Sequence, residues 1–251
     1  MKTFLNRFAI VALSFVCFAT PASAAPFSID GNVGLQAFVS LTDAHVGTTL
    51  NALVAFSGTA AARSGSWSEI EGALRAATYG NVPETLIYAT PGGRYWVVGK
   101  GLQPVPIADR PYFAQVFSGK NAVGDLVMGR SSGKPVAIVA VPVRGANGSV
   151  TGLVGAAVDL TALNAILVKE LGLQAGMVFW AVDARGVTAL HSDPANIFND
   201  VSKDPRLATL LKHMIATDSG YQTYTFKGKT RSVLFRHSAL TGWTYGFGIV
   251  H

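Results

Sequence analysis

The sequence has a single cysteine, Cys17, and that cysteine lies in the apolar segment at the N-terminus. Lys2 and Arg7 precede the apolar core "FAIVALSFVCFAT", and the small residues "ASA" follow it, a pattern typical of an export signal. The apolar run is about a dozen residues long, short of the roughly 20 that a membrane-spanning helix needs. We expect cleavage of residues 1–24, near Ala24. An uncleaved signal that anchors the chain and lipidation at Cys17 stay open as alternatives.

Cleavage at that point leaves a mature chain without cysteine, which excludes both disulfides and thiol catalysis. An exported chain of this kind favours the bacterial periplasm over a eukaryotic secretory route, with secretion as the other destination. We therefore expect a protein that is periplasmic or secreted after the signal is removed.

Charged residues are also scarce, at 14% of the chain. The signal contains two of the 20 Lys and Arg and none of the 14 Asp and Glu, so the mature balance is 18 − 14 = +4. The basic residues are scattered and do not cluster with aromatic residues, which argues against a nucleic-acid partner. The histidines do not fall at the spacing of a metal site, and we expect neither a metal nor a cofactor. They are His45, His191, His213, His237 and His251.

Two short motifs resemble catalytic signatures. The stretch "GRSSGK" at 129–134 lacks the Ser or Thr that follows the lysine of a phosphate-binding loop. It also matches G-x-S-x-G by letter, but a strand rather than a helix is predicted after it. His191, Ser192 and Asp193 alternate between the two faces of a predicted strand, so they do not form a triad. These motifs make an enzyme the least favoured interpretation.

Hydrophobic periodicity predicts a first unit of helices followed by strands. One apolar stripe predicts a long helix over 32–62, and "SWSEIEGALRAAT" predicts a second helix. The later segments are rich in branched and aromatic residues and are separated by Gly-containing turns. We expect strands at 84–90, 94–100, 125–130, 135–144 and 150–160, with a short helix at about 110–118 between the second and the third.

A second round of elements repeats this order. A helix is predicted at 161–171, with Asp159 as its N-cap, and then two strands, a helix at 204–216 and three strands. We interpret the aromatic residues of these strands as core and edge packing; they are Trp180, Tyr221, Tyr224, Phe226 and Trp243. Antiparallel strands flanked by helices predict an α+β fold in two modules, with boundaries at 28–160 and 161–251.

The helix in "ADRPYFAQVFSG" contains two residues that helix formation does not explain. Asp109 is expected to cap the N-terminus, and Pro111 suits the first turn. Arg110 and Tyr112 have no such role. A guanidinium offers two parallel donors that match a carboxylate, and a phenol adds a third, so this pair is a candidate carboxylate site.

Three stretches carry a family likeness. "DRPYF", "GRSSGKPVAIVAVPV" and "GSVTGLVGAAVDL" together resemble the extracytoplasmic double Cache domain of bacterial chemoreceptors and sensor kinases. The resemblance implies a long N-terminal helix followed by two PAS-like modules, each with an antiparallel sheet of about five strands flanked by helices. The first module would be of the membrane-distal type and the second Cache-like.

The resemblance also implies a ligand site in the first module. Arg110 and Tyr112 would hold a ligand carboxylate, with Phe113 and Trp96 as apolar walls. Arg130 and Ser132, with Lys134 beside them, would supply a second grip for an anion.

Two positions depart from the pattern of the members that bind amino acids. Those members have a Tyr five residues before the Arg, where this chain has Val105, and an Asp that holds the ligand ammonium, where this chain has Ala157. Asp159 has the same strand parity, but we interpret it as the cap of the next helix. A small carboxylate without an amine is therefore favoured over an α-amino acid.

The chain ends at His251, directly after the last predicted strand, where related sensors continue into a transmembrane helix and an output domain. We therefore expect a periplasmic protein that binds and senses a small carboxylate and acts through a separate membrane receptor, kinase or transporter. The N-terminal helix of related sensors pairs, which makes a weak homodimer the expected assembly. The alternative is a Cache-fold structural or interaction module that binds a protein and no ligand.

Overall fold

The computed structural model describes residues 30–77 and 79–251, and the predicted export signal lies outside them. The α-helices are α1 Gly31–Ser57, α2 Ala60–Arg63, α3 Trp67–Ala76, α4 Pro111–Phe117, α5 Leu160–Leu171 and α6 Pro205–Ala216. The strands are β1 Glu84–Ala89, β2 Tyr95–Val97, β3 Gly101–Leu102, β4 Ala122–Met128, β5 Pro135–Arg144, β6 Val150–Asp159, β7 Met177–Val182, β8 Thr188–His191, β9 Ser219–Phe226, β10 Lys229–His237 and β11 Thr244–Val250. Two 3₁₀ segments, Pro194–Asn196 and Val201–Lys203, lie between β8 and α6.

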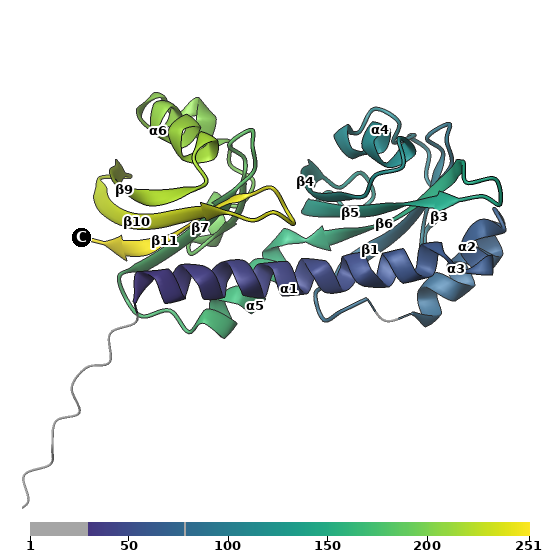
Figure 1. The fold of residues 1–251 in the computed structure, drawn as a ribbon, viewed down its shortest axis with the longest axis horizontal. Coiled ribbons are helices and arrows are strands. Elements are labelled where there is room, and N and C mark those ends of the chain that lie inside the picture. The colour runs from purple at the N-terminus through teal and green to yellow at the C-terminus, as the bar shows by residue number, and fades with distance from the viewer. Residues whose placement is uncertain (1–29, 78) are drawn as a thin grey trace, which may run out of the picture.

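The strands form two antiparallel sheets that lie side by side above α1 (Figure 1). The first sheet has the order β3-β2-β1-β6-β5-β4, and the second has the order β8-β7-β11-β10-β9. When the two-residue strand β3 is left out, each half has five strands, which can be numbered one to five along the chain. Both sheets then have the same spatial order, 2-1-5-4-3. The predicted α+β fold with two similar halves is confirmed, and β3 is the one strand that the sequence did not predict.

The long helix α1 packs against both sheets. The ring of Phe38 lies 4.6 Å from that of Phe179 and 5.0 Å from that of Tyr245, so this part of α1 is fixed to the second sheet. The predicted continuous helix over 32–62 was wrong at its C-terminal end. It ends at Ser57, and Thr59 starts the short helix α2 by accepting a hydrogen bond from the main-chain N–H of Ala62.

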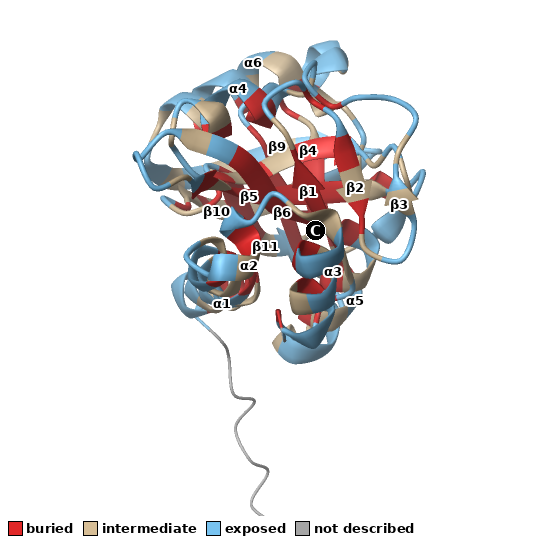
Figure 2. Ribbon diagram, turned by 90° about the vertical axis from the view of Figure 1, so that its right-hand side faces the viewer, coloured by how far each residue is buried: buried red, intermediate tan, exposed pale blue. Residues whose placement is uncertain are grey.

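The alternation of side chains along the strands divides the core into two layers. On one face of each sheet the buried side chains pack against α1, and on the other they pack against α4 or α6. Figure 2 shows that the buried residues concentrate in the strands, whereas the outer helical surfaces are exposed. None of the described helices is both long and apolar enough to cross a membrane.

The two short helices that flank the first sheet differ in their caps. Asp159 caps α5 as predicted, because its carboxylate accepts the main-chain N–H groups of Thr161 (3.0 Å) and Ala162 (3.1 Å). The predicted cap of α4 by Asp109 was wrong. Arg110 occupies the N-cap position and its side chain makes no capping bond, so Asp109 lies one residue too early to reach the first-turn amides.

The halves contact each other through β4. The register of β4 shifts between Val123 and Asp125, and Gly124 in this irregularity has a φ of +90°. The buried indole of Trp243 donates from Nε1 to the Gly124 carbonyl (2.8 Å), and Arg185 Nη2 donates to the Leu126 carbonyl (2.8 Å). Both donors belong to the second half, so main-chain carbonyls of β4 fix the relative position of the sheets.

This contact predicts an unequal cost for two glycine substitutions. A Cβ at Gly124 would lie 2.6 Å from the Thr241 carbonyl oxygen and 3.0 Å from Trp243 Nε1, whereas one at Gly148 (φ +81°) meets nothing within 4 Å. We expect Gly148→Ala to lower the free energy of unfolding by about 1 kcal/mol, through backbone strain alone. We expect Gly124→Ala to cost roughly 1–3 kcal/mol more, because the contact must also move apart. Urea unfolding of the two variants measures the difference, and equal costs would contradict this view of the contact.

A half-buried carboxyl group predicts a pH dependence of stability. Glu84 lies at the start of β1 and accepts a hydrogen bond from the Thr49 hydroxyl (3.0 Å), and burial raises its pKa to about 7. Because this value lies above that of the unfolded chain, the folded state binds the extra proton, and stability falls as pH rises from about 4.5 to about 7. The contribution is at most about 3 kcal/mol.

Glu84→Gln should remove this decline and raise the free energy of unfolding at neutral pH relative to the parent protein. Urea unfolding of both proteins at several pH values measures the effect. A parent protein and a variant with parallel stability profiles between pH 4 and 8 would contradict it, since the two differ only in this titration.

Candidate functional site

A small cavity of about 30 Å³ lies in the first half, between the sheet and α4. Its apolar lining consists of Ile87, Ile107, Val127, Met128, Ile138 and Ala157. Its polar lining consists of Tyr95, Arg110, Tyr112, Arg130 and Ser131, with Gly129 between them. No acidic side chain is among these lining residues.

Strand alternation brings the sheet residues of the cavity to one face. Ile138 on β5 pairs directly with Ala157 on β6, and both lie on the α4 side of the sheet with Ile87 and Tyr95. The connection after β3 and the start of α4 supply Ile107, Arg110 and Tyr112. The connection after β4 supplies Arg130 and Ser131, so the sheet, α4 and two connections close the space.

Arg110 and Tyr112 reach the cavity from the first turn of α4. Arg110 donates from Nη2 to the main-chain carbonyl of Met128 (3.1 Å), which ties the start of α4 to the end of β4. Tyr112 is 3% exposed, and burial raises its pKa to about 12, although the nearby Arg110 and Arg130 oppose this shift. Its hydroxyl therefore stays protonated at neutral pH and is available as a donor.

Arg130 and Tyr95 complete the polar side. Arg130 donates to the main-chain carbonyl of Pro106 and to the Asp109 carboxylate (Nη1–Oδ1 2.9 Å), which raises the pKa of the guanidinium and lowers that of Asp109. Burial raises the pKa of Tyr95, and the two arginines oppose the shift. Two guanidiniums and two protonated phenols therefore meet at one small space.

This arrangement suits a small anion. The cavity presents cationic and neutral donors and apolar walls, so a carboxylate would gain charge-assisted hydrogen bonds there. A volume of about 10–15 Å³ holds one water, so a cavity of this size holds a molecule with only a few heavy atoms.

Comparison with known proteins shows what this fold is. No protein-family model matches the chain, and no curated protein matches it. Among solved structures, Methyl-accepting Chemotaxis protein X has a TM-score of 0.70 at 16% identity, with 88% of this chain and 96% of that chain covered. The ligand-binding domain of the Pseudomonas aeruginosa PAO1 amino acid chemoreceptor PctB, in complex with L-Arg, has a TM-score of 0.64 at 18% identity, covering 87% and 93%. The periplasmic sensory domain of the Campylobacter jejuni chemoreceptor Tlp1 has a TM-score of 0.62 at 12% identity, covering 86% and 91%.

The fold is that of the double Cache domain. The likeness extends over both halves of the chain, so each half has the fold of a Cache module, and we refer to the halves as the first and the second Cache module. Identities of 12–18% describe the fold alone, and the chemistry of the site has to be argued from the residues of this chain.

The first Cache module brings three of the predicted residues together and separates the others. Arg110, Tyr112 and Arg130 line the cavity. Trp96 lies on the opposite face of the sheet, where its ring is 6.2 Å from that of Trp67. Phe113 belongs to α4 and is buried, with its ring 4.4 Å from that of Phe117. It does not line the cavity.

The residues predicted as a second anion site, Arg130, Ser132 and Lys134, do not all reach the cavity. Ser131 lines the cavity, whereas Ser132 accepts a hydrogen bond from the main-chain N–H of Lys134. Lys134 forms an ion pair with Asp159 (2.8 Å). Of the two positions that depart from the amino-acid pattern, Ala157 lies on the cavity wall and Val105 is 54% exposed outside it.

Sequence reasoning missed Tyr95, Ile107, Met128 and Ser131. The alternation in "RYWVV" contains the missing signal for Tyr95, because it places Tyr95 and Trp96 on opposite faces of the hairpin. Only the resemblance favoured Trp96. No pattern in the sequence identifies Ile107 or Ser131, since both lie in irregular connections whose path depends on packing.

Proposed function

We propose that this protein is a periplasmic sensory domain that binds a small carboxylate without an amine in its first Cache module and acts through a separate membrane protein. The observation that supports this proposal best is the convergence of Arg110, Tyr112, Tyr95 and Arg130 on one cavity with an otherwise apolar wall. Such donors bind an anion more strongly when partly removed from water.

The choice against an α-amino acid rests on Ala157. An ammonium group in the cavity would need an acceptor, and Ala157, Ile138 and Ile87 provide none on the sheet side. The carbonyl of Met128 already accepts from Arg110, and Asp109 is paired with Arg130. An α-amino acid would therefore bury its ammonium without a carboxylate partner among the lining residues, at a cost of several kcal/mol.

The sensing role rests on β4. One end of this strand contacts Arg110 through the Met128 carbonyl, and its middle contacts the second module through Gly124 and Leu126. A ligand that takes up donors of Arg110 changes the interactions at the end of β4. The same strand transmits any resulting shift to the contact between the modules.

A second function has two observations in its favour. The cavity is small, and Arg110 and Arg130 both have partners within the described part of the chain. These features also suit a Cache-fold module that binds a protein and no ligand.

A thermal-shift measurement with formate, acetate, propionate and lactate tests the carboxylate site. A ligand at 100 times its Kd stabilises by about 2.7 kcal/mol, which corresponds to roughly 5–10 °C for a chain of this size. We expect this shift in the parent protein, its loss in Arg110→Gln, and a smaller shift in Tyr112→Phe. Arg63→Gln, which alters an exposed arginine at the end of α2, should keep the full response.

The same experiment separates the two functions. Absence of any shift with all four acids would favour the protein-binding module. A shift that survives in Arg110→Gln would place the ligand elsewhere and reject the site.

Substitution of Ala157 tests the charge preference of the cavity wall. Ala157→Asp adds a carboxylate beside the guanidiniums, and Ala157→Asn adds nearly the same volume without the charge. We expect the Asp variant to bind acetate at least about tenfold more weakly than the Asn variant, because like charges repel in a poorly solvated space. Isothermal titration calorimetry provides both Kd values, and equal values would show that the ligand carboxylate does not face this wall.

A further inference from the structure

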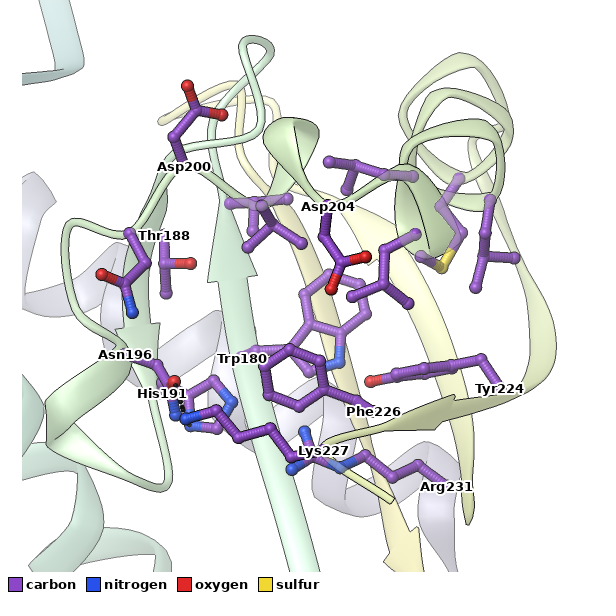
Figure 3. Close-up of a pocket in the computed structure, with 17 residues that line it drawn as sticks. Trp180, Thr188, His191, Asn196, Asp200, Asp204, Tyr224, Phe226, Lys227 and Arg231 are labelled. Carbon is purple, nitrogen blue, oxygen red and sulfur yellow. Dashed lines mark hydrogen bonds between the residues drawn. The ribbon is translucent and has the colours of Figure 1, made fainter. Parts of the chain in front are cut away.

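A second and larger cavity, of about 270 Å³, lies in the second Cache module (Figure 3). It is enclosed by the face of β7, β8, β9 and β10 that is turned away from α1, by α6, and by the connection between β8 and α6. The first cavity has the same position in its own module. It lies between the sheet and α4, which precedes β4 in the chain as α6 precedes β9. The repeated fold therefore contains two equivalent spaces, and the proposed function uses only the smaller.

The walls of this cavity are mainly apolar and aromatic. β7 contributes Trp180 and Val182, α6 contributes Leu211 and Met214, and β9 contributes Phe226. The ring of Phe226 lies in front of Trp180 in Figure 3. Apolar walls of this kind favour the non-polar body of an organic ligand.

Cationic groups gather at one end. Arg231 and Lys227 lie together below Phe226 in Figure 3, with the guanidinium 4.7 Å and the ammonium 5.4 Å from the centre of its ring. Lys227 also donates to Asn196 Oδ1 (2.9 Å). Neither cation forms an ion pair within the described residues.

The acidic residues of the lining are already neutralised. Asp204 forms an ion pair with Arg206 (2.8 Å) and caps α6, and Asp200 forms one with Lys203 (3.3 Å). Both lie in Figure 3 at the end away from Arg231 and Lys227. The positive charge at the other end is therefore not balanced within the cavity.

Two buried donors also lack partners there. Trp180 is 6% exposed, and its Nε1 has no hydrogen-bond partner of normal geometry within the described residues, although the Tyr224 hydroxyl lies beside it. Arg231 Nε is buried without a partner of normal geometry in the same part of the chain, and the Tyr224 hydroxyl lies near this guanidinium as well. Buried donors are nearly always paired in folded proteins, so two in one cavity indicate that an acceptor binds there.

His191 adds a third donor. Its Nδ1 accepts the main-chain N–H of Asp193 (2.8 Å), which leaves the proton of the neutral ring on Nε2. Burial, together with the charge of Arg231, lowers its pKa to about 4, so the ring is neutral at physiological pH. In Figure 3 the ring lies beside Lys227 at the cationic end of the cavity.

We propose that this cavity is a second ligand site, for a carboxylate that carries a single aromatic ring. The carboxylate binds at Arg231, with Lys227 and the His191 Nε2–H beside it, and the ring lies among Trp180, Phe226 and the side chains of α6. A cavity of about 150 Å³ holds benzene, so 270 Å³ holds a ring with a short acidic side chain. This site is independent of the small-carboxylate site in the first module.

Isothermal titration calorimetry of the purified protein with benzoate, phenylacetate and 3-phenylpropionate tests the proposal. We expect at least one of them to bind, and phenylacetamide, which lacks the charge, to bind at least about tenfold more weakly than phenylacetate. Arg231→Gln should weaken binding of the acid by about tenfold or more. Arg236→Gln, on the same strand but directed toward Gln36 of α1, is the matched control and should leave the Kd unchanged.

Three results would overturn the proposal: no binding of any of the three acids at millimolar concentration, an unchanged Kd in Arg231→Gln, or loss of binding in Arg110→Gln instead. Should Arg231→Gln fail to fold, Lys227→Gln on the exposed turn provides the same comparison, with a rise in Kd expected and an unchanged Kd rejecting the site. Acetate binding in the Arg231 variant reports separately on the first module, so either site can fail without the other.

Discussion

The packing of one helix against two sheets places both of the cavities described above on the opposite faces of those sheets. Phe38 of α1 packs against Phe179 and Tyr245 of the second sheet. The C-terminal part of the same helix packs on the first sheet. Because α1 covers one face of each sheet, only the opposite faces are left for α4 and α6. Both cavities lie on those faces. A change in the direction of α1 would therefore reach both modules through the sheets that lie between the helix and the cavities.

The two cavities resemble each other in charge as well as in place. Arg130 follows β4, the third strand of the first module, and Lys227 follows β9, the third strand of the second. Each lines its cavity and donates to an oxygen of a nearby loop. They differ in what opposes the charge, since Asp109 pairs with Arg130 whereas Lys227 has only the neutral amide of Asn196. The positive charge of the larger cavity is therefore less neutralised by nearby carboxylates. The smaller cavity gathers its donors in a smaller volume.

The sequence predicted the order of the elements because apolar spacing, turn residues and the Asp159 cap are local signals. It failed for Asp109, where a longer-range pair with Arg130 prevailed over capping. The interpretation of Trp180 and Tyr224 as packing residues is confirmed, because Trp180 belongs to a core cluster and Tyr224 packs against it. The sequence did not show that these two and Phe226 also line the second cavity. The sequence pattern of an aromatic residue on a strand is the same whether its side chain packs against a neighbour or lines a cavity. The difference arises from the path of the connection between β8 and α6, which periodicity does not describe.

Under the proposed function, the strand β4 would connect the ligand site to the second module. Its last carbonyl accepts from Arg110, and its middle carbonyls accept from Trp243 and Arg185 of the second module. Hydrogen bonds to main-chain carbonyls are directional, so a strand held at three points can rotate or shift only if at least one bond lengthens. In the proposed site, a carboxylate would compete with Met128 for the donors of Arg110 and would weaken the first of these bonds without touching the other two. The equilibrium between arrangements of the modules then moves by the difference in ligand affinity for those arrangements, and by no more than that difference.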